Sequence, residues 1–257
     1  MSIVFLNISK EEFLANKKPL HKHMSLENAL NVLNLRSIWF ANPTIWKDPF
    51  EKQFVTAKYI KDKIEYDFPW KERVFCACFT ETATSEAFWV PYSQQQIGIE
   101  FKINRKELIN QLEKHSHVYD IYVGKVEYMM TKSITGSIYS IPFTKPLPTK
   151  ESNLWWARLL LLKRNAYKYE DEVRIILVKK QSTVKDGIPL KFDCSPTTLI
   201  ESVVLDPNIG KFTEQLLKDI FINKFAFSPI TNKAGRTQNR VVKSQLYTEL
   251  KERKIKL

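Results

Sequence analysis

Glycine, cysteine and long apolar runs are all scarce in this sequence, and each scarcity excludes a class of protein. The 6 glycines among 257 residues form no G-x-G-x-x-G or Walker loop, which removes the two commonest nucleotide-binding folds. Three cysteines, an odd number, do not make a disulfide framework in a chain of this size. No apolar run approaches the roughly 18 residues that cross a bilayer, and the first residues reach Asn7 and Lys10 too early for a signal peptide. We therefore expect a cytoplasmic protein without a membrane partner.

Acidic residues are also in the minority, and this imbalance points to an anionic partner. Lys and Arg number 40 against 28 Asp and Glu, so the formal net charge is +12. A surplus of this size attracts polyanions and speeds the encounter with them, although a basic surface can also serve solubility alone. We expect nucleic acid as the partner, RNA before DNA. Its phosphate backbone would contact basic residues of a long loop and of the tail: Lys132, Lys145, Arg236, Arg240 and Lys243.

Apolar spacing and capping residues predict a mixture of helices and strands. Helices are predicted over residues 9–15, 25–33, 104–112, 152–165 and 212–225. Strands are predicted over residues 19–24, 37–41, 74–80, 97–103, 119–128, 167–179 and 199–205. Residues 131–150, with three prolines, predict a long loop. Because helices and strands do not alternate regularly, we expect one α+β domain with a mixed or antiparallel central sheet and flanking helices. Its core would lie at about 20–230, with a basic tail over 231–257.

The segment from Tyr167 to Ile176 is the most informative part of the sequence. If it forms a strand, Glu170, Glu172 and Arg174 share one face, because successive side chains alternate. One interpretation is an exposed face with Glu–Arg ion pairs, which are common on surfaces. The other is an acid pair facing a cleft, where a carboxylate binds a sugar hydroxyl and stabilises the oxocarbenium-like transition state of N-glycosidic cleavage.

Two other segments offer candidates for binding a phosphate or an aromatic ring. Lys22, on the first long strand, would hold a phosphate or ribose as a point charge, or it would simply face solvent. Trp89 and Tyr92 follow the strand over 75–80 and would supply a stacking platform for a base or a nicotinamide ring, or belong to the core.

Paired His and Cys residues raise the question of a metal. Cys76 and Cys78, His21 and His23, and His115 and His117 are each spaced two apart, so each pair shares one face if it lies on a strand. Structural zinc sites use C-x-x-C spacing, however, and cysteine in an F-C-A-C-F strand behaves as a small buried hydrophobe. We expect no metal.

The order of these motifs resembles the bacterial domain-of-unknown-function family numbered 2971. The resemblance covers roughly residues 20–210, and its pieces in chain order are Leu20–His23, Trp39–Pro43, Asp48–Glu51, Cys78–Thr80 with Trp89 and Tyr92, Gly98–Phe101, Val126–Tyr128 and Tyr169–Arg174. Lys47 replaces the Asn expected before D-P-F-E, and His21 and His23 replace the usual tyrosines.

The layout is also similar to that of ADP-ribosyltransferases, which have a split sheet. Their first strand carries a basic or His residue, a middle strand carries Ser or Thr, and a late strand carries a catalytic Glu, often as E-x-E. The resemblance implies that Lys22 is the basic residue, Thr80 the Ser/Thr position, Glu172 the catalytic Glu and Glu170 the acceptor-side Glu. Lysine in place of Arg or His at the first position is a departure from that pattern.

The same resemblance implies NAD as co-substrate and no metal. Lys22, His21 and Arg174 would hold the ribose or phosphates of NAD, and Trp89 or Tyr92 would stack on its nicotinamide. Bacterial toxins of this superfamily modify nucleic acid in phage defence or toxin–antitoxin systems, which implies an antitoxin or chaperone as a protein partner. Two alternatives remain: a non-catalytic nucleic-acid-binding defence module, and a nuclease-like hydrolase whose carboxylates bind Mg²⁺.

Overall fold

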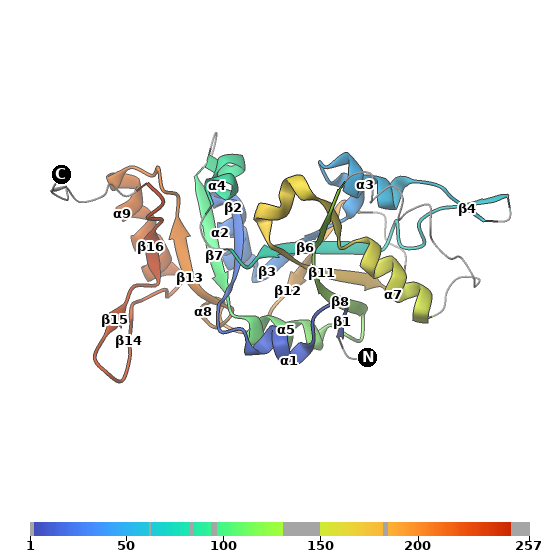
Figure 1. Ribbon diagram of the computed structural model, residues 1–257. Coiled ribbons are helices and arrows are strands. Elements are labelled where there is room, and N and C mark those ends of the chain that lie inside the picture. Colours follow the sequence, from blue (N-terminus) through green and yellow to red (C-terminus); the bar gives the residue numbers. More distant parts are fainter. Residues whose placement is uncertain are drawn as a thin grey trace, which may run out of the picture.

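A ten-stranded mixed sheet runs through the centre of the molecule, with helices packed on both faces (Figure 1). The computed structural model describes residues 3–61, 63–82, 85–93, 97–130, 150–181 and 185–247. In order across the sheet, the strands are β1 (Val4–Phe5), β8 (Tyr119–Lys125), β11 (Glu172–Lys179), β6 (Val74–Thr80), β2 (Leu20–Ser25), β7 (Gly98–Ile103), β13 (Ile200–Leu205) and β16 (Val241–Lys243). Two more strands branch from β6: β3 (Ser37–Ala41), which pairs with β6, and β12 (Gly187–Lys191), which pairs with β3. The predicted α+β fold with a mixed central sheet is confirmed.

Shorter elements surround this sheet. The two-stranded sheets are β4 (Tyr59–Lys61) with β5 (Ile64–Tyr66), β9 (Glu127–Met129) with β10 (Leu162–Arg164), and β14 (Ile230–Thr231) with β15 (Thr237–Gln238). The α-helices are α1 (Lys10–Ala15), α2 (Leu26–Leu35), α3 (Pro49–Thr56), α4 (Glu86–Ser93), α5 (Arg105–Lys114), α7 (Lys150–Leu159), α8 (Pro196–Leu199) and α9 (Lys211–Asp219). The 3₁₀-helices are η1 (Pro43–Ile45) and η2 (Asn165–Glu170), and η3 (Ile220–Lys224) is a π-helical turn. No helix within the described ranges is long and apolar enough to cross a membrane.

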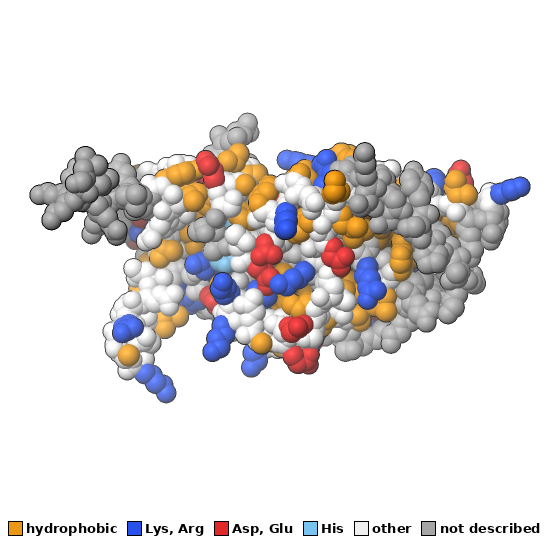
Figure 2. All heavy atoms as spheres, viewed as in Figure 1, with side chains coloured by type: hydrophobic (Ala, Val, Ile, Leu, Met, Phe, Trp, Pro, Cys, Tyr) orange, Lys and Arg blue, Asp and Glu red, His pale blue; other side chains and the backbone are white. Residues whose placement is uncertain are grey.

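Charged side chains of both signs are interspersed across the middle of the face shown in Figure 2. The hairpin of β14 and β15 projects from the body at the lower left of Figure 1, and in the same view of Figure 2 it carries basic side chains.

The sheet opens between β2 and β6. These two neighbours are paired only where His21 meets Thr80, whereas β6 pairs with β11, and β2 with β7, along their whole lengths. Helix α4 packs against β2 and β7 beside the opening. A sheet that splits in this way exposes polar backbone and side chains at its centre, a place that an unbroken sheet would fill with apolar contacts.

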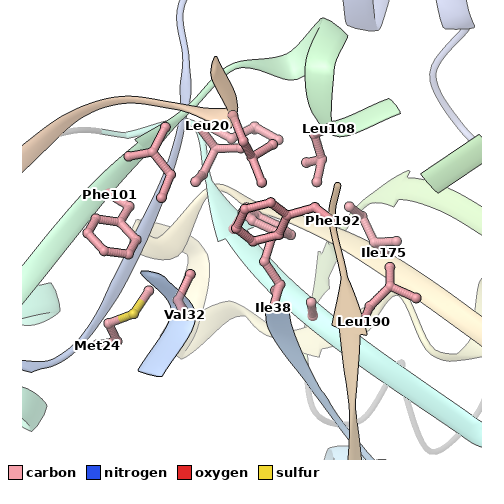
Figure 3. Close-up of a cluster of buried hydrophobic side chains, with 14 of the residues drawn as sticks. Leu20, Met24, Val32, Ile38, Phe101, Leu108, Ile175, Leu190 and Phe192 are labelled. Carbon is pink, nitrogen blue, oxygen red and sulfur yellow. The ribbon is translucent and has the colours of Figure 1, made fainter. Parts of the chain in front are cut away.

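Two hydrophobic cores lie on opposite faces of the sheet because alternate residues of β6 and β11 point to opposite sides. Phe75, Phe79 and Ile175 belong to the larger core, which continues through the residues labelled in Figure 3. Cys76 and Ile176 belong to the smaller core, under α3 and α7. On this second face the last positions of the two strands are polar, and the candidate site begins there.

Most elements form where the capping residues and apolar periodicity predict them. The Ser9–Glu12 capping box is present at α1, and the Ser25 and Asn104 side chains accept backbone N–H groups at the starts of α2 and α5. Sequence reasoning did not predict α3 as a helix. It begins where the Asp48 side chain accepts the N–H of Phe50 and Pro49 occupies the first turn, which is a favourable helix start.

Two predictions around the most informative segment were wrong. The strand predicted over 167–179 begins only at Glu172, because residues 165–170 form η2 and Asp171 takes the left-handed conformation with φ 41°. The helix predicted over 152–165 ends at Leu159, and Leu162–Arg164 pair with β9 as the short strand β10. Both changes bring Lys163 and Glu170 toward the end of β11.

Candidate functional site

Three polar residues stand in a row across the opening of the sheet. His21 on β2 is paired with Thr80 on β6, and Thr80 is paired on its other side with Glu172 on β11. Directly paired residues of antiparallel strands project from the same face, and strands lie about 4.8 Å apart, so the row spans about 10 Å. We call His21, Thr80 and Glu172 the polar row.

A cavity of about 170 Å³ lies over the polar row, and all three of its residues line it. Phe88 of α4 and Tyr169 of η2 form an aromatic wall, with ring centroids 6.1 Å apart and ring planes tilted by 55°. Tyr169 is 45% exposed and stands at the mouth, whereas Glu172 is buried at the floor. The cavity therefore combines an apolar wall for a flat ring with polar groups that can bind hydroxyls.

Glu172 is an ionised carboxylate held in place by two cations. Its Oε1 accepts from Arg174 Nε at 2.8 Å, and its Oε2 accepts from Lys163 Nζ at 2.9 Å. Burial alone would raise the pKa of Glu172, but the positive charges of Arg174 and Lys163 outweigh it and lower the pKa to about 2. Glu172 thus keeps its negative charge at neutral pH although it is almost wholly buried.

Arg174 is committed to the protein interior and not to the cavity. Besides Glu172, it donates to Glu51 Oε1 at 2.7 Å and to the main-chain oxygen of Leu160, and its guanidinium lies 4.4 Å from the centre of the Trp46 ring. Its side chain is 1% exposed. The prediction that Arg174 binds the phosphates or ribose of NAD was therefore wrong, because every nitrogen of its guanidinium already has a partner. It is a positioning residue for Glu172.

Lys163 joins the carboxylates into one cluster. Its Nζ lies 2.5 Å from Glu170 Oε2 and 3.7 Å from Glu51 Oε2, in addition to its bond to Glu172. Burial opposes its charge, but the negative charges of Glu172 and Glu51 prevail and raise the pKa of Lys163. We call Glu51, Lys163, Glu170, Glu172 and Arg174 the buried ion cluster. Its three carboxylates and two cations leave one net negative charge when all are ionised.

Glu170 is the member of the buried ion cluster that faces outward. It lines the cavity, and its side chain is 24% exposed, against 3% for Glu172. Burial raises the pKa of Glu170 above its ordinary value in spite of the nearby Lys163 ammonium. A carboxylate at a cavity mouth with a raised pKa is suited to accept and release a proton.

The motif Trp46–Glu51 contributes to the same cluster from the other side. Trp46 covers Arg174, and Glu51 binds both cations. Asp48 caps α3 and accepts from Arg164 Nη2 at 2.9 Å, one residue beyond Lys163. Tyr128 accepts the backbone N–H of Glu172 through its hydroxyl at 2.9 Å, which fixes the start of β11. Motifs that are far apart in the sequence therefore meet around Glu172.

A second buried group supports the other end of the polar row. His21 Nδ1 lies 2.7 Å from Glu100 Oε1, and His23 Nε2 lies 3.3 Å from Glu100 Oε2. Burial works to raise the pKa of Glu100, but hydrogen bonds from the two histidines outweigh it and lower the pKa to about 2. His23 also stacks on Phe88 with ring centroids 4.9 Å apart. Glu100 thus orients the His21 ring and, through His23, the aromatic wall.

Glu100 predicts a specific dependence of stability on acid. Its folded-state pKa of about 2 lies below the ordinary value of 4.5, so its stabilising effect is present above pH 4.5 and is lost as the pH falls toward 2. We expect Glu100→Gln to lower the free energy of unfolding by about 3 kcal/mol at pH 6 and by only about 1 kcal/mol at pH 3. Urea unfolding of both proteins at each pH measures this difference. A difference that does not change with pH would contradict the assignment.

The structure brings together four of the predicted site residues: His21, Thr80, Glu170 and Glu172 all line the cavity. Lys22 does not line it. Its Nζ donates to the main-chain oxygen of Cys78 at 3.0 Å across the sheet opening and lies 4.9 Å from the centre of the Phe79 ring, and burial lowers its pKa. On β2 the residue that faces the cavity from the polar row is therefore His21 and not Lys22, which corrects the prediction.

The predicted stacking residues have different outcomes. Trp89 is 2% exposed and packs edge-on against His23 behind the cavity, so its prediction as a stacking platform was wrong. Phe88, its neighbour on α4, takes that place. The Tyr92 side chain lies outside the part of the chain that is described.

Two of the predicted nucleic-acid contacts serve the fold. Arg240 is buried and donates to the main-chain oxygens of Thr197, Ile200 and Glu201, and Lys243 donates to the main-chain oxygen of Ile209. Their prediction as phosphate-binding residues was wrong for this reason. Arg236 is exposed on the hairpin of β14 and β15, where a phosphate could reach it. Lys132 and Lys145 lie outside the described residues.

The paired His and Cys residues are engaged in other ways. His21 and His23 bind Glu100, and burial, followed by the charge of Glu172, raises the pKa of the Cys78 thiol to about 12, so that it stays protonated. Among the described residues, no group of three or more His, Cys, Asp or Glu side chains is arranged to hold a metal ion.

Sequence reasoning missed Lys163, Glu51 and Phe88 as site residues. Lys163 and Arg164 end an apolar run that begins at Leu159, and a lysine next to so many buried neighbours needs carboxylate partners. That was the available signal. Comparison of the chain with protein-family models, curated proteins and solved structures finds no match. The resemblance to the family numbered 2971 therefore stays a prediction.

Proposed function

We propose that this chain is an ADP-ribosyltransferase-like enzyme that transfers ADP-ribose from NAD to nucleic acid. The observation that carries the proposal is the polar row. A His on the first long strand, a Thr on a middle strand and a Glu on a late strand are the three features of that enzyme class. In this chain they stand directly opposite one another over one cavity.

The chemistry of Glu172 supports this proposal. When the N-glycosidic bond of NAD breaks, its electron pair leaves with nicotinamide and the ribose carbon becomes cationic. A buried, permanently ionised carboxylate stabilises such a cation more than the neutral ground state, and this difference is what accelerates the reaction. Arg174 and Lys163 keep Glu172 ionised and fixed, so no reorganisation is needed when the charge develops.

Glu170 supplies the second half of the reaction. The acceptor atom forms a bond to the ribose carbon and must lose a proton. Glu170 faces the cavity with a raised pKa, and it can take that proton as the general base. Lys163, which bonds to both carboxylates, would keep the two roles at a fixed separation.

The size of the cavity favours the nicotinamide end of NAD as its occupant. About 170 Å³ is below the roughly 300–1,000 Å³ of typical ligand pockets, so it suits a single ring with part of its sugar. The nicotinamide ring would lie against Phe88 and Tyr169, with its ribose hydroxyls toward Glu172. The remaining phosphates and adenosine would lie outside the mouth.

Incubation with NAD and nucleic acid tests the proposal. The purified protein is mixed with NAD and, separately, with RNA, DNA or buffer, and mass spectrometry follows free nicotinamide and the mass of the nucleic acid. We expect nicotinamide release, and an ADP-ribose adduct on one of the two nucleic acids. Absence of nicotinamide release with every acceptor would refute the proposed function.

Tyr169 gives a sharper prediction for ligand binding. We expect Tyr169→Ala to weaken nicotinamide binding by about 10-fold, since stacking on an aromatic side chain contributes about 1–3 kcal/mol per ring. Tyr169→Phe should bind normally, because the ring and not the hydroxyl forms the wall. Titration of nicotinamide followed by tryptophan fluorescence measures both. Equal affinity of all three proteins would show that the ring binds elsewhere.

A further inference from the structure

The hairpin formed by β14 and β15 is an exposed arm. Every residue from 228 to 239 is exposed to solvent, and Figure 1 shows the hairpin extending away from the sheet. We call residues 228–239 the arm. It buries no apolar side chain of its own, so the hydrophobic core does not stabilise it. An isolated two-stranded hairpin is marginally stable, and the structure therefore holds this one by other means.

Both ends of the arm are fixed to the body. Phe227, just before it, is fully buried, and the Arg240 guanidinium, just after it, lies 5.0 Å from the centre of the Phe227 ring. Arg240 also donates to three main-chain oxygens next to β13, and β16 continues the chain by pairing with β13. The base of the arm is therefore rigid.

The tip of the arm is shaped by its turn. Asn232 Oδ1 accepts the N–H groups of Ala234 and Arg236, each at 3.0 Å, and Gly235 takes a positive φ of 74°. The hydroxyls of Thr231 and Thr237 lie 3.0 Å apart across the two strands. These local bonds define one hairpin shape without any contact to the core, and they leave the outward side chains free.

The charge of the arm points to an anionic partner. The chain contains no Asp or Glu from Ile220 to Lys243, but five Lys and Arg. Arg240 and Lys243 are used in holding main-chain oxygens, which leaves Lys224, Lys233 and Arg236 exposed at or near the arm. Figure 2 shows basic side chains on this projection.

We propose that the arm binds the phosphate backbone of nucleic acid, through Lys233 and Arg236 at its tip and Lys224 at its base. The arm precedes β16, which lies three strands from β2, or about 14 Å at the usual strand spacing. About four nucleotides span that distance at 3.4 Å per charge along a strand. A strand held by the arm therefore reaches the cavity. Its role as the acceptor rests on the proposed function, but the binding itself does not.

Fluorescence anisotropy with labelled single-stranded RNA and DNA tests the arm. The oligonucleotides are about 20 nucleotides long, which exceeds the usual site of one small domain, and no NAD is present. We expect Lys233→Glu with Arg236→Glu to weaken binding at least about 10-fold. The slope of log affinity against log salt should fall by about 1.4, at about 0.7 for each phosphate contact on a single strand.

A matched control separates the arm from the overall charge. Lys106→Glu with Lys191→Glu changes the net charge by the same amount at exposed positions on α5 and β12, and should bind both oligonucleotides as the wild type does. Equal weakening by both double variants, or by neither, would overturn the proposal. Because NAD is absent, failure of the transferase proposal leaves this result unaffected, and a protein that releases nicotinamide but does not use the arm would overturn only this one.

Discussion

Replacing Arg174 by methionine should lower the free energy of unfolding by about 3–5 kcal/mol, the largest stability effect that we expect. Arg174 is 1% exposed and neutralises both Glu51 and Glu172. Methionine fills similar space but removes the charge, so Lys163 alone must balance three buried or half-buried carboxylates. Urea unfolding at pH 7 measures the loss.

The control is a double variant that restores the balance of charge. Arg174→Met with Glu51→Leu removes one cation and one carboxylate, which returns the buried ion cluster to its original net charge. We expect it to regain at least half of the stability that the single variant loses, because a buried ion pair replaced as a unit by apolar groups is often near neutral. If the single variant is as stable as the wild type, the buried ion cluster does not hold this part of the fold together.

Replacing Glu172 by glutamine should lower the rate of nicotinamide release by about 10²- to 10³-fold, the largest effect that we expect on activity. Glutamine keeps the size of the side chain but lacks the charge that stabilises the ribose cation. The rate is measured with saturating NAD, so that a change in NAD affinity does not enter. The expected loss is in kcat, because the charge acts on the transition state and not on the bound substrate.

Glu51→Gln is the matched control for this variant. It removes one charge from the same two cations, but Glu51 contributes to the floor of the buried ion cluster and does not line the cavity. We expect both variants to lose similar stability in urea, and Glu51→Gln to stay within about 10-fold of the wild-type rate. Equal catalytic losses would mean that the cluster, and not the carboxylate in the cavity, determines the rate.

The fold could be predicted to the level of its elements, and the reasons are local. The strands over 37–41 and 74–80 form within the predicted bounds, since alternating or continuous apolar residues end at turn residues there. The order of the strands could not be predicted, because pairing between β6, β2 and β11 depends on contacts that are far apart in the sequence. The polar row exists only as a consequence of that order.

The candidate site could be predicted in part. Glu172 and Thr80 were identified correctly as cavity residues, because charged and hydroxyl side chains at the ends of apolar strands are conspicuous. The side of β2 that faces the cavity could not be read from Leu20–His23, since alternation separates His21 from Lys22 without saying which points inward. Glu170 reaches the cavity through the left-handed turn at Asp171, a conformation that Asp tolerates but that no sequence pattern announced.

A crystal structure of the Glu172→Gln variant with NAD tests the central claim most directly, because this variant should bind NAD without cleaving it. The account predicts the nicotinamide ring against Phe88 and Tyr169, with a ribose hydroxyl within hydrogen-bond distance of residue 172 and His21 at the other end of the polar row. Nicotinamide bound at any other place, or an empty cavity at saturating NAD, would contradict it.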